Sequence, residues 1–164
     1  MKRTAIALGA ALIASTLLAD TPVPPKPPNI GWVATMSTQK GTSLLVSVRN
    51  QVPGDVKPAA YPRIVEMHWK YAPDEKGMPA NAVVTQMARL EAAVDPIQGD
   101  RVGYVMMIVT GGGERVWLWY VADAKAFAAD LNRLIPDHPF PITLHAAATE
   151  PDWQTYRLMR DKIK

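Results

Sequence analysis

The chain has 164 residues, of which 18 are Lys or Arg and 15 are Asp or Glu, so its formal charge at pH 7 is +3. It contains no cysteine, which excludes a disulfide framework, an iron–sulfur cluster, a thiolate zinc site, a cysteine nucleophile and a lipid on an N-terminal cysteine. An apolar fraction of 48% beside 20% charged residues is typical of one globular domain rather than of a disordered chain.

The first 19 residues have the layout of a secretory signal peptide. Lys2 and Arg3 make a basic start, residues 4–19 are uncharged and rich in Ala, Leu and Ile, and Asp20 follows. The alternative is a membrane anchor, but residues 4–19 would span only about 24 Å as a helix, against a hydrocarbon core of about 30 Å. We therefore predict a chain that is exported, periplasmic or secreted, through a cleaved signal peptide and that keeps no membrane span.

Removal of residues 1–19 takes away two basic residues, so the mature chain has 16 basic and 15 acidic residues and a charge of +1. A nearly neutral domain lacks the basic surface that nucleic-acid binding needs, and RNA binding is disfavoured. Residues 20–28 hold five prolines, which favour an extended and semi-rigid linker. Residues 29–164 are then expected to form a single domain of ordinary size.

The domain begins with a predicted β-hairpin, because strand-like runs at residues 32–37 and 44–49 flank a turn signal at residues 39–42. A loop that contains three prolines and a glycine follows at residues 51–62. Residues 63–71 alternate between apolar and polar side chains, which predicts a half-buried strand with one wet face.

A helix is predicted over residues 80–94 by the spacing of its apolar positions, and Asp95-Pro96 ends it. The apolar runs at residues 102–110 and 114–121 predict two strands joined by a glycine hairpin. Three consecutive glycines are also found in phosphate-binding loops, but such a loop leads into a helix and here a strand follows.

Asp123 can cap the next helix, in which Phe127 and Leu131 belong to an apolar stripe. A strand at residues 141–147 and a last helix, which Asp152 can cap, complete the chain. Apart from the hairpin, the order strand, helix, strand, strand, helix, strand is that of a ferredoxin-like split βαβ fold. We therefore predict an α/β domain of the α+β type, with an antiparallel sheet, an N-terminal β-hairpin and a C-terminal helix.

The strand at residues 114–121 carries the strongest candidate for a binding surface. Arg115, Trp117 and Trp119 alternate with apolar residues and so share one face of this strand. If the helices pack on its other face, these three side chains lie on the open side of the sheet beside Glu66 and His68, as in a protein interface. Alternatively, the hairpin or the last helix covers this side, and both tryptophans belong to the core.

A metal-dependent hydrolase is the alternative function, with Glu66, His68 and His145 as its candidate residues. Two imidazoles and a carboxylate bind zinc and leave one position open. However, this spacing is equally typical of polar residues on an exposed sheet face, and no serine lies in a Gly-x-Ser-x-Gly turn. We therefore expect a non-enzymatic module, without catalytic residues, metal or cofactor, that binds a protein or cell-envelope component.

A set of short motifs follows a fixed order along the chain: Tyr61-Pro62, Trp69-Lys70-Tyr71, Gly77-Met78-Pro79, Leu90-Glu91, Thr110-Gly111-Gly112-Gly113, Trp119-Tyr120, Glu150-Pro151-Asp152-Trp153 and Tyr156. Over roughly residues 30–160 the chain thereby resembles a family of uncharacterised proteins, domain of unknown function 695. The resemblance implies a ferredoxin-like α/β domain and distant kinship with the B-type regulator of ribonuclease E activity, an inhibitory protein-binding module. It implies no catalytic residues, and the predicted export argues against a role on a cytoplasmic ribonuclease.

Overall fold

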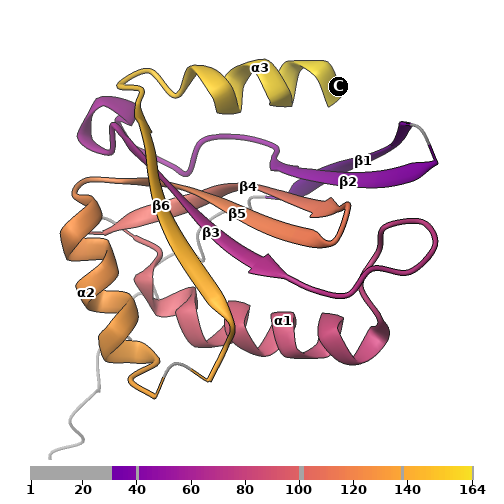
Figure 1. The fold of residues 1–164 in the computed structure, drawn as a ribbon. Coiled ribbons are helices and arrows are strands. Elements are labelled where there is room, and N and C mark those ends of the chain that lie inside the picture. Colours follow the sequence, from indigo (N-terminus) through magenta and orange to yellow (C-terminus); the bar gives the residue numbers. More distant parts are fainter. Residues whose placement is uncertain (1–30, 40, 100–101, 138, 164) are drawn as a thin grey trace, which may run out of the picture.

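The structure is a computed structural model that describes residues 31–39, 41–99, 102–137 and 139–163. The predicted signal peptide and the proline-rich linker lie outside the described residues. Within them, six antiparallel strands form one sheet, and three α-helices pack on its two faces (Figure 1). The predicted α+β class, with an N-terminal hairpin and a C-terminal helix, is confirmed.

Each predicted strand and helix is present, with ends that differ from the prediction by at most a few residues. The strands are β1 (Trp32–Gln39), β2 (Thr42–Arg49), β3 (Arg63–Lys70), β4 (Gly103–Gly111), β5 (Glu114–Val121) and β6 (Ile142–Thr149). The helices are α1 (Asn81–Val94), α2 (Ala124–Leu134) and α3 (Gln154–Ile163), with the short 3-10 turns η1 (Pro58–Ala60) and η2 (Asp95–Ile97).

The sheet combines a split βαβ unit with an added hairpin. Its strand order is β1-β2-β4-β5-β3-β6, and every neighbouring pair is antiparallel. The strands β4-β5-β3-β6 are those of the predicted ferredoxin-like unit, with β3 between β5 and β6 at its centre. The β1–β2 hairpin continues this sheet by pairing β2 with β4. It therefore extends the sheet and does not pack across one of its faces.

One face of the sheet packs on α1 and α2 (Figure 1). Asp123 caps α2 as predicted, because its carboxylate accepts a hydrogen bond of 2.8 Å from the backbone N–H of Ala126. Apolar side chains at helical spacing on both helices meet the alternating apolar residues of the strands. The residues buried at this interface include Met67, Trp69, Met87, Leu90, Trp117, Trp119, Phe127 and Leu131.

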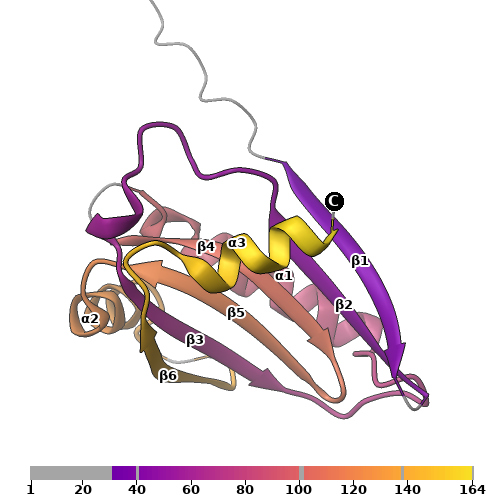
Figure 2. The same cartoon turned by 90° about the horizontal axis from the view of Figure 1, so that it is seen from above.

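The opposite face of the sheet packs on α3, which crosses the strands obliquely (Figure 2). Trp153 and Tyr156 are fully buried here, and the ring of Trp153 stacks on Tyr120 with 4.6 Å between ring centroids. The indole N–H of Trp153 donates a 2.9 Å hydrogen bond to the carbonyl of Tyr61. The sheet is therefore covered by helices on both sides, and β5 is buried on both faces.

Glu150 fixes the start of α3. Its carboxylate accepts hydrogen bonds from the Thr155 hydroxyl at 2.6 Å, the Thr155 N–H at 2.9 Å and the Tyr120 hydroxyl at 2.9 Å. Burial alone would raise the pKa of Glu150, but the bonds from Thr155 and Tyr120 outweigh it and hold the pKa below its usual value. The backbone N–H of Thr155, in the first turn of α3, thus donates to Glu150. Asp152, the predicted cap, does not accept it.

The glycines between β4 and β5 let this hairpin approach two other segments closely. The N–H of Gly113 donates to the carbonyl of Gly77 at 3.2 Å, and the N–H of Tyr71 donates to the carbonyl of Gly113 at 2.9 Å. Gly111 has φ +150°, where a side chain is strained, and lies against the backbone of Ser43. The glycine-rich segment is therefore a strand connection, as predicted, rather than a phosphate loop.

Candidate functional site

Trp117 and Trp119 do not lie on the sheet face that carries Glu66 and His68. Each of the two tryptophans is only 1% exposed, because their face of β5 packs against α1 and α2. Across the β3–β5 pairing, Trp117 lies opposite Met67, whereas Glu66 lies opposite Leu118. Direct cross-strand partners point to the same side of a sheet. The expectation of one open face that joins the tryptophans to Glu66 and His68 is therefore wrong.

The charge of Arg115 is balanced by a carboxylate of α1. Its guanidinium donates to Glu91 at 2.8 Å, and the indole N–H of Trp117 donates to the same carboxylate oxygen at 2.8 Å. The guanidinium also lies 5.2 Å from the centre of the Trp117 ring. Arg115 and Trp117 are thus tied to α1, and Nε of Arg115 is buried without a hydrogen-bond partner among the described residues.

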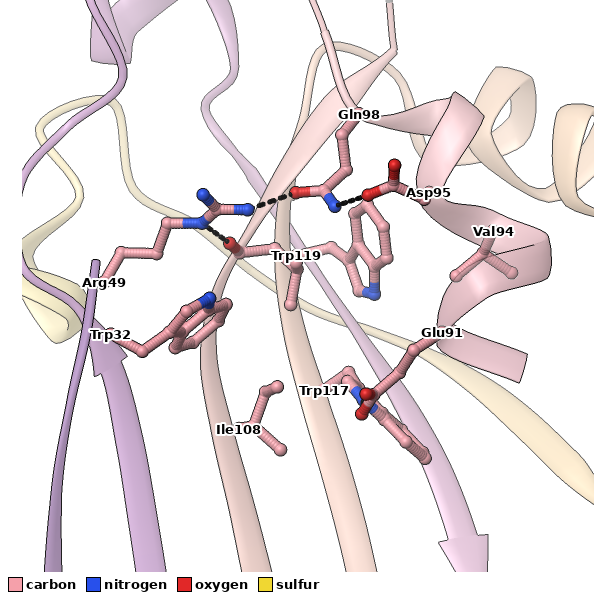
Figure 3. A pocket seen from close by; sticks show the side chains of 10 residues that line it. Trp32, Arg49, Glu91, Val94, Asp95, Gln98, Ile108, Trp117 and Trp119 are labelled. Atoms are coloured by element: carbon pink, nitrogen blue, oxygen red, sulfur yellow. Dashed lines mark hydrogen bonds between the residues drawn. The ribbon is translucent and has the colours of Figure 1, made fainter. Parts of the chain in front are cut away.

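Both tryptophans nevertheless line a pocket of about 180 Å³ on the α1 side of the sheet (Figure 3). The pocket lies where side chains of the β1–β2 hairpin meet those of β4, β5, α1 and the segment that follows α1. Its walls combine three indole rings with aliphatic side chains and a few polar groups. The lining residues are Trp32, Arg49, Glu91, Val94, Asp95, Gln98, Val105, Ile108, Trp117 and Trp119.

A chain of hydrogen bonds closes one end of this pocket (Figure 3). Arg49 donates from Nε to the carbonyl of Val105 at 3.0 Å and from Nη2 to the side-chain oxygen of Gln98 at 2.6 Å. The amide nitrogen of Gln98 donates in turn to Asp95 at 2.9 Å. Burial lowers the pKa of the Arg49 guanidinium below its usual value, although the negative charge of Asp95 opposes this effect.

Trp32 forms the outer wall of the pocket. It stands opposite Arg49 in the β1–β2 pairing, and the guanidinium lies 5.0 Å from the centre of its ring. Trp32 remains 39% exposed. Sequence reasoning missed Trp32, Arg49 and Gln98 as site residues. For Trp32 and Arg49 a signal was available, because they lie at the open ends of the two hairpin strands and so pair directly across them.

The residues of the predicted metal site gather on the other face of the sheet. Nδ1 and Nε2 of His68 each lie 3.1 Å from a carboxylate oxygen, of Glu114 and Glu66 respectively. The ring of His145 meets that of His68 edge-on, with 4.8 Å between centroids. In the described parts of the chain, no group of three or more His, Cys, Asp or Glu side chains is arranged to hold a metal ion.

A family model described as a family of unknown function (DUF695) matches residues 31–159, which is most of the chain. No curated protein and no solved structure matches it. Among the described residues, none of the helices combines the length and the apolar character needed to cross a membrane.

Proposed function

This chain belongs to the DUF695 family of unknown function, and we propose that it is an exported, non-enzymatic binding module that takes its ligand into the pocket beside Trp32. The observation that carries this proposal is the pocket itself. Ligand sites are typically concave and apolar, with a few placed polar groups, and three indoles with Arg49 and Gln98 match this description.

The pocket supports binding rather than catalysis because both of its carboxylates are already engaged with other side chains. Glu91 accepts from Arg115 and Trp117, and Asp95 accepts from Gln98. A general acid or base needs a proton site that faces the reactant, and neither carboxylate is held in a nucleophile–base pair. We therefore propose that the ligand contacts the protein at this pocket, while the protein or cell-envelope partner of the sequence analysis stays a prediction.

Replacement of Trp32 by Ala tests the proposal. We expect single-ring aromatic compounds to bind the native protein and to bind Trp32→Ala at least about tenfold more weakly, as for an aromatic anchor of a site. The fold is expected to survive, because Trp32 is 39% exposed on the edge strand β1. Ligand-observed NMR with a set of such compounds measures the effect.

Met36→Ala is the matched control, because Met36 lies on the same strand and is 60% exposed but does not line the pocket. We expect this variant to bind like the native protein. Equal binding by the native protein and Trp32→Ala, or no binding to the native protein, would contradict the proposed function.

The export part of the proposal rests on the basic start and apolar run of residues 1–19. Protein recovered from the exported fraction of an expressing bacterium is expected to begin at Asp20. N-terminal sequencing and intact mass measure this directly. A mature chain that retains Met1 would overturn the cleaved signal peptide, and replacement of Lys2 and Arg3 by Glu is expected to lower the exported amount.

The alternative of a metal-dependent hydrolase that uses Glu66, His68 and His145 is less well supported. Both ring nitrogens of His68 already face carboxylates at 3.1 Å, so neither nitrogen is directed at a shared open position. A melting shift on addition of Zn²⁺ that disappears in His68→Gln would favour this alternative over the binding module.

A further inference from the structure

The charges around the pocket beside Trp32 indicate which ligand it suits. Resting on the proposed function, we propose that the pocket binds a small aromatic carboxylate, with its ring among the indoles and its carboxylate at the guanidinium of Arg49. This goes beyond a binding role in general, because it assigns the ligand a size, a charge and a residue that recognises the charge.

Arg49 is the lining residue whose charge is least compensated. Glu91 is paired with Arg115 at 2.8 Å, and Asp95 is exposed to water, which screens its charge. Arg49 is half-buried, and its hydrogen bonds go to a backbone carbonyl and an amide, both neutral. No carboxylate of the described residues forms an ion pair with it. A half-buried cation of this kind is stabilised by an anion.

The guanidinium is within reach of a ligand because it stands between two hollows. Arg49, Asp95 and Gln98 line both the pocket and an adjoining hollow of about 230 Å³, to which Pro53 and Tyr104 also contribute. Nη1 of Arg49 has no hydrogen-bond partner among the described residues. A carboxylate placed there would form a charge-assisted hydrogen bond without displacing the bond to Val105.

The volume and the walls favour a single aromatic ring. An apolar cavity of about 150 Å³ holds one benzene molecule, and this pocket measures about 180 Å³. Trp32, Trp117 and Trp119 provide ring faces and edges, against which another aromatic ring packs well. A one-ring molecule with a short substituent therefore fits, which favours a free small molecule over the bulkier end of a peptide.

The walls contain acceptors in Glu91, Asp95 and Gln98, and they also contain one donor without a partner in the described part of the chain. The indole Nε1 of Trp119 is buried and has no partner among the described residues, and in Figure 3 it lies on the α1 side of its ring. A buried donor without an acceptor is destabilising, but the protein covers this atom, so it offers no contact to a ligand in the pocket. The selection of a carboxylate over an ammonium group therefore depends on Arg49.

Three probes that share one ring and differ in charge test the assignment: benzoate, benzamide and benzylamine. In calorimetric titrations of the purified protein we expect benzoate to bind at least about tenfold more tightly than benzamide, and benzylamine to bind most weakly. Arg49→Gln is expected to abolish the preference for benzoate, so that benzoate and benzamide bind with about equal affinity. Arg157→Gln on α3, which is exposed and does not line the pocket, is the control and should change nothing.

The outcomes separate this inference from the proposed function. If the probes bind equally, if benzylamine binds best, or if Arg49→Gln keeps the preference for benzoate, the carboxylate assignment is overturned while the pocket remains a binding site. If no probe binds the native protein and the aromatic set also fails, the proposed function is overturned with it. Should Arg49→Gln fail to fold, Arg49→Lys keeps the charge and is expected to retain the benzoate preference.

Discussion

Replacement of Trp153 by Ala is expected to lower the free energy of unfolding by about 3–5 kcal/mol, the usual cost of removing a buried Trp side chain. Trp153 is fully buried between α3 and the sheet, stacks on Tyr120 and meets Tyr156 edge-on at 6.1 Å between centroids. The substitution also leaves the carbonyl of Tyr61 without the donor that bonds it at 2.9 Å. A loss of this size is a large part of the stability of an ordinary domain.

Urea unfolding followed by circular dichroism measures this effect. Leu158→Ala, on α3 but 55% exposed, is the control and is expected to change the free energy of unfolding by no more than about 0.5 kcal/mol. If Trp153→Ala costs less than about 1 kcal/mol, then α3 does not depend on this residue for its docking. Trp153→Phe, which keeps a ring but loses the N–H, is expected to fall between the native protein and Trp153→Ala.

Gly111→Ala is expected to destabilise the protein by about 2–6 kcal/mol, because two costs coincide at this position. Its φ of +150° is strained for any residue with a side chain, at about 1–3 kcal/mol. In addition, a methyl group there would overlap the carbonyl oxygen of Ser43 and lie 3.1 Å from the Cα of Leu44. Since both neighbours are backbone, β2 must move away from β4, at about 1–3 kcal/mol more.

Gly99→Ala separates these two costs. Gly99 has a similar φ of +146°, but a methyl group there would meet no atom within 4 Å. Chemical denaturation is therefore expected to show that Gly99→Ala lowers the free energy of unfolding through strain alone. Gly111→Ala is expected to lower it by more. Equal losses would mean that the close approach of β2 and β4 has no energetic cost. A smaller loss for Gly111→Ala would contradict the account of this hairpin.

The fold could be predicted from the sequence because each element carries its own local signal. Alternation marks β3, helical spacing marks α1, and Asp123 marks the start of α2. The start of α3 was less predictable. Its capping carboxylate belongs to Glu150, further from the helix than the usual capping position, and is held there by Tyr120 from a distant strand.

The sequence could not show which side chains of β5 face which helices, and the reason is physical. Alternation divides its side chains into two sets, but both sets are apolar because α1 and α2 cover one face and α3 covers the other. A strand buried on both faces carries no polar stripe to show which set meets which helix. Trp117 and Trp119 belong to the core, as one of the two alternatives expected, but α1 and α2 cover them rather than the hairpin or the last helix.

The pocket was beyond sequence reasoning because its walls come from segments that only tertiary pairing brings together. Trp32 and Arg49 meet through the hairpin register, while Gln98 reaches Arg49 from the segment after α1. None of these residues belongs to a motif with a known chemistry. Arg115 and Trp117 were recognised as notable, but their partner Glu91 lies on another element and turns them inward.

The bond between the Tyr156 hydroxyl and the backbone carbonyl of Arg49, at 3.0 Å, joins residues 107 positions apart in the chain. During synthesis the β1–β2 hairpin therefore emerges long before α3, which carries Tyr156. Contacts between such distant residues raise the contact order of the fold, which slows folding. The site beside Trp32 begins with the earliest described strand, yet the backbone of Arg49 gains this bond only when synthesis has passed residue 156.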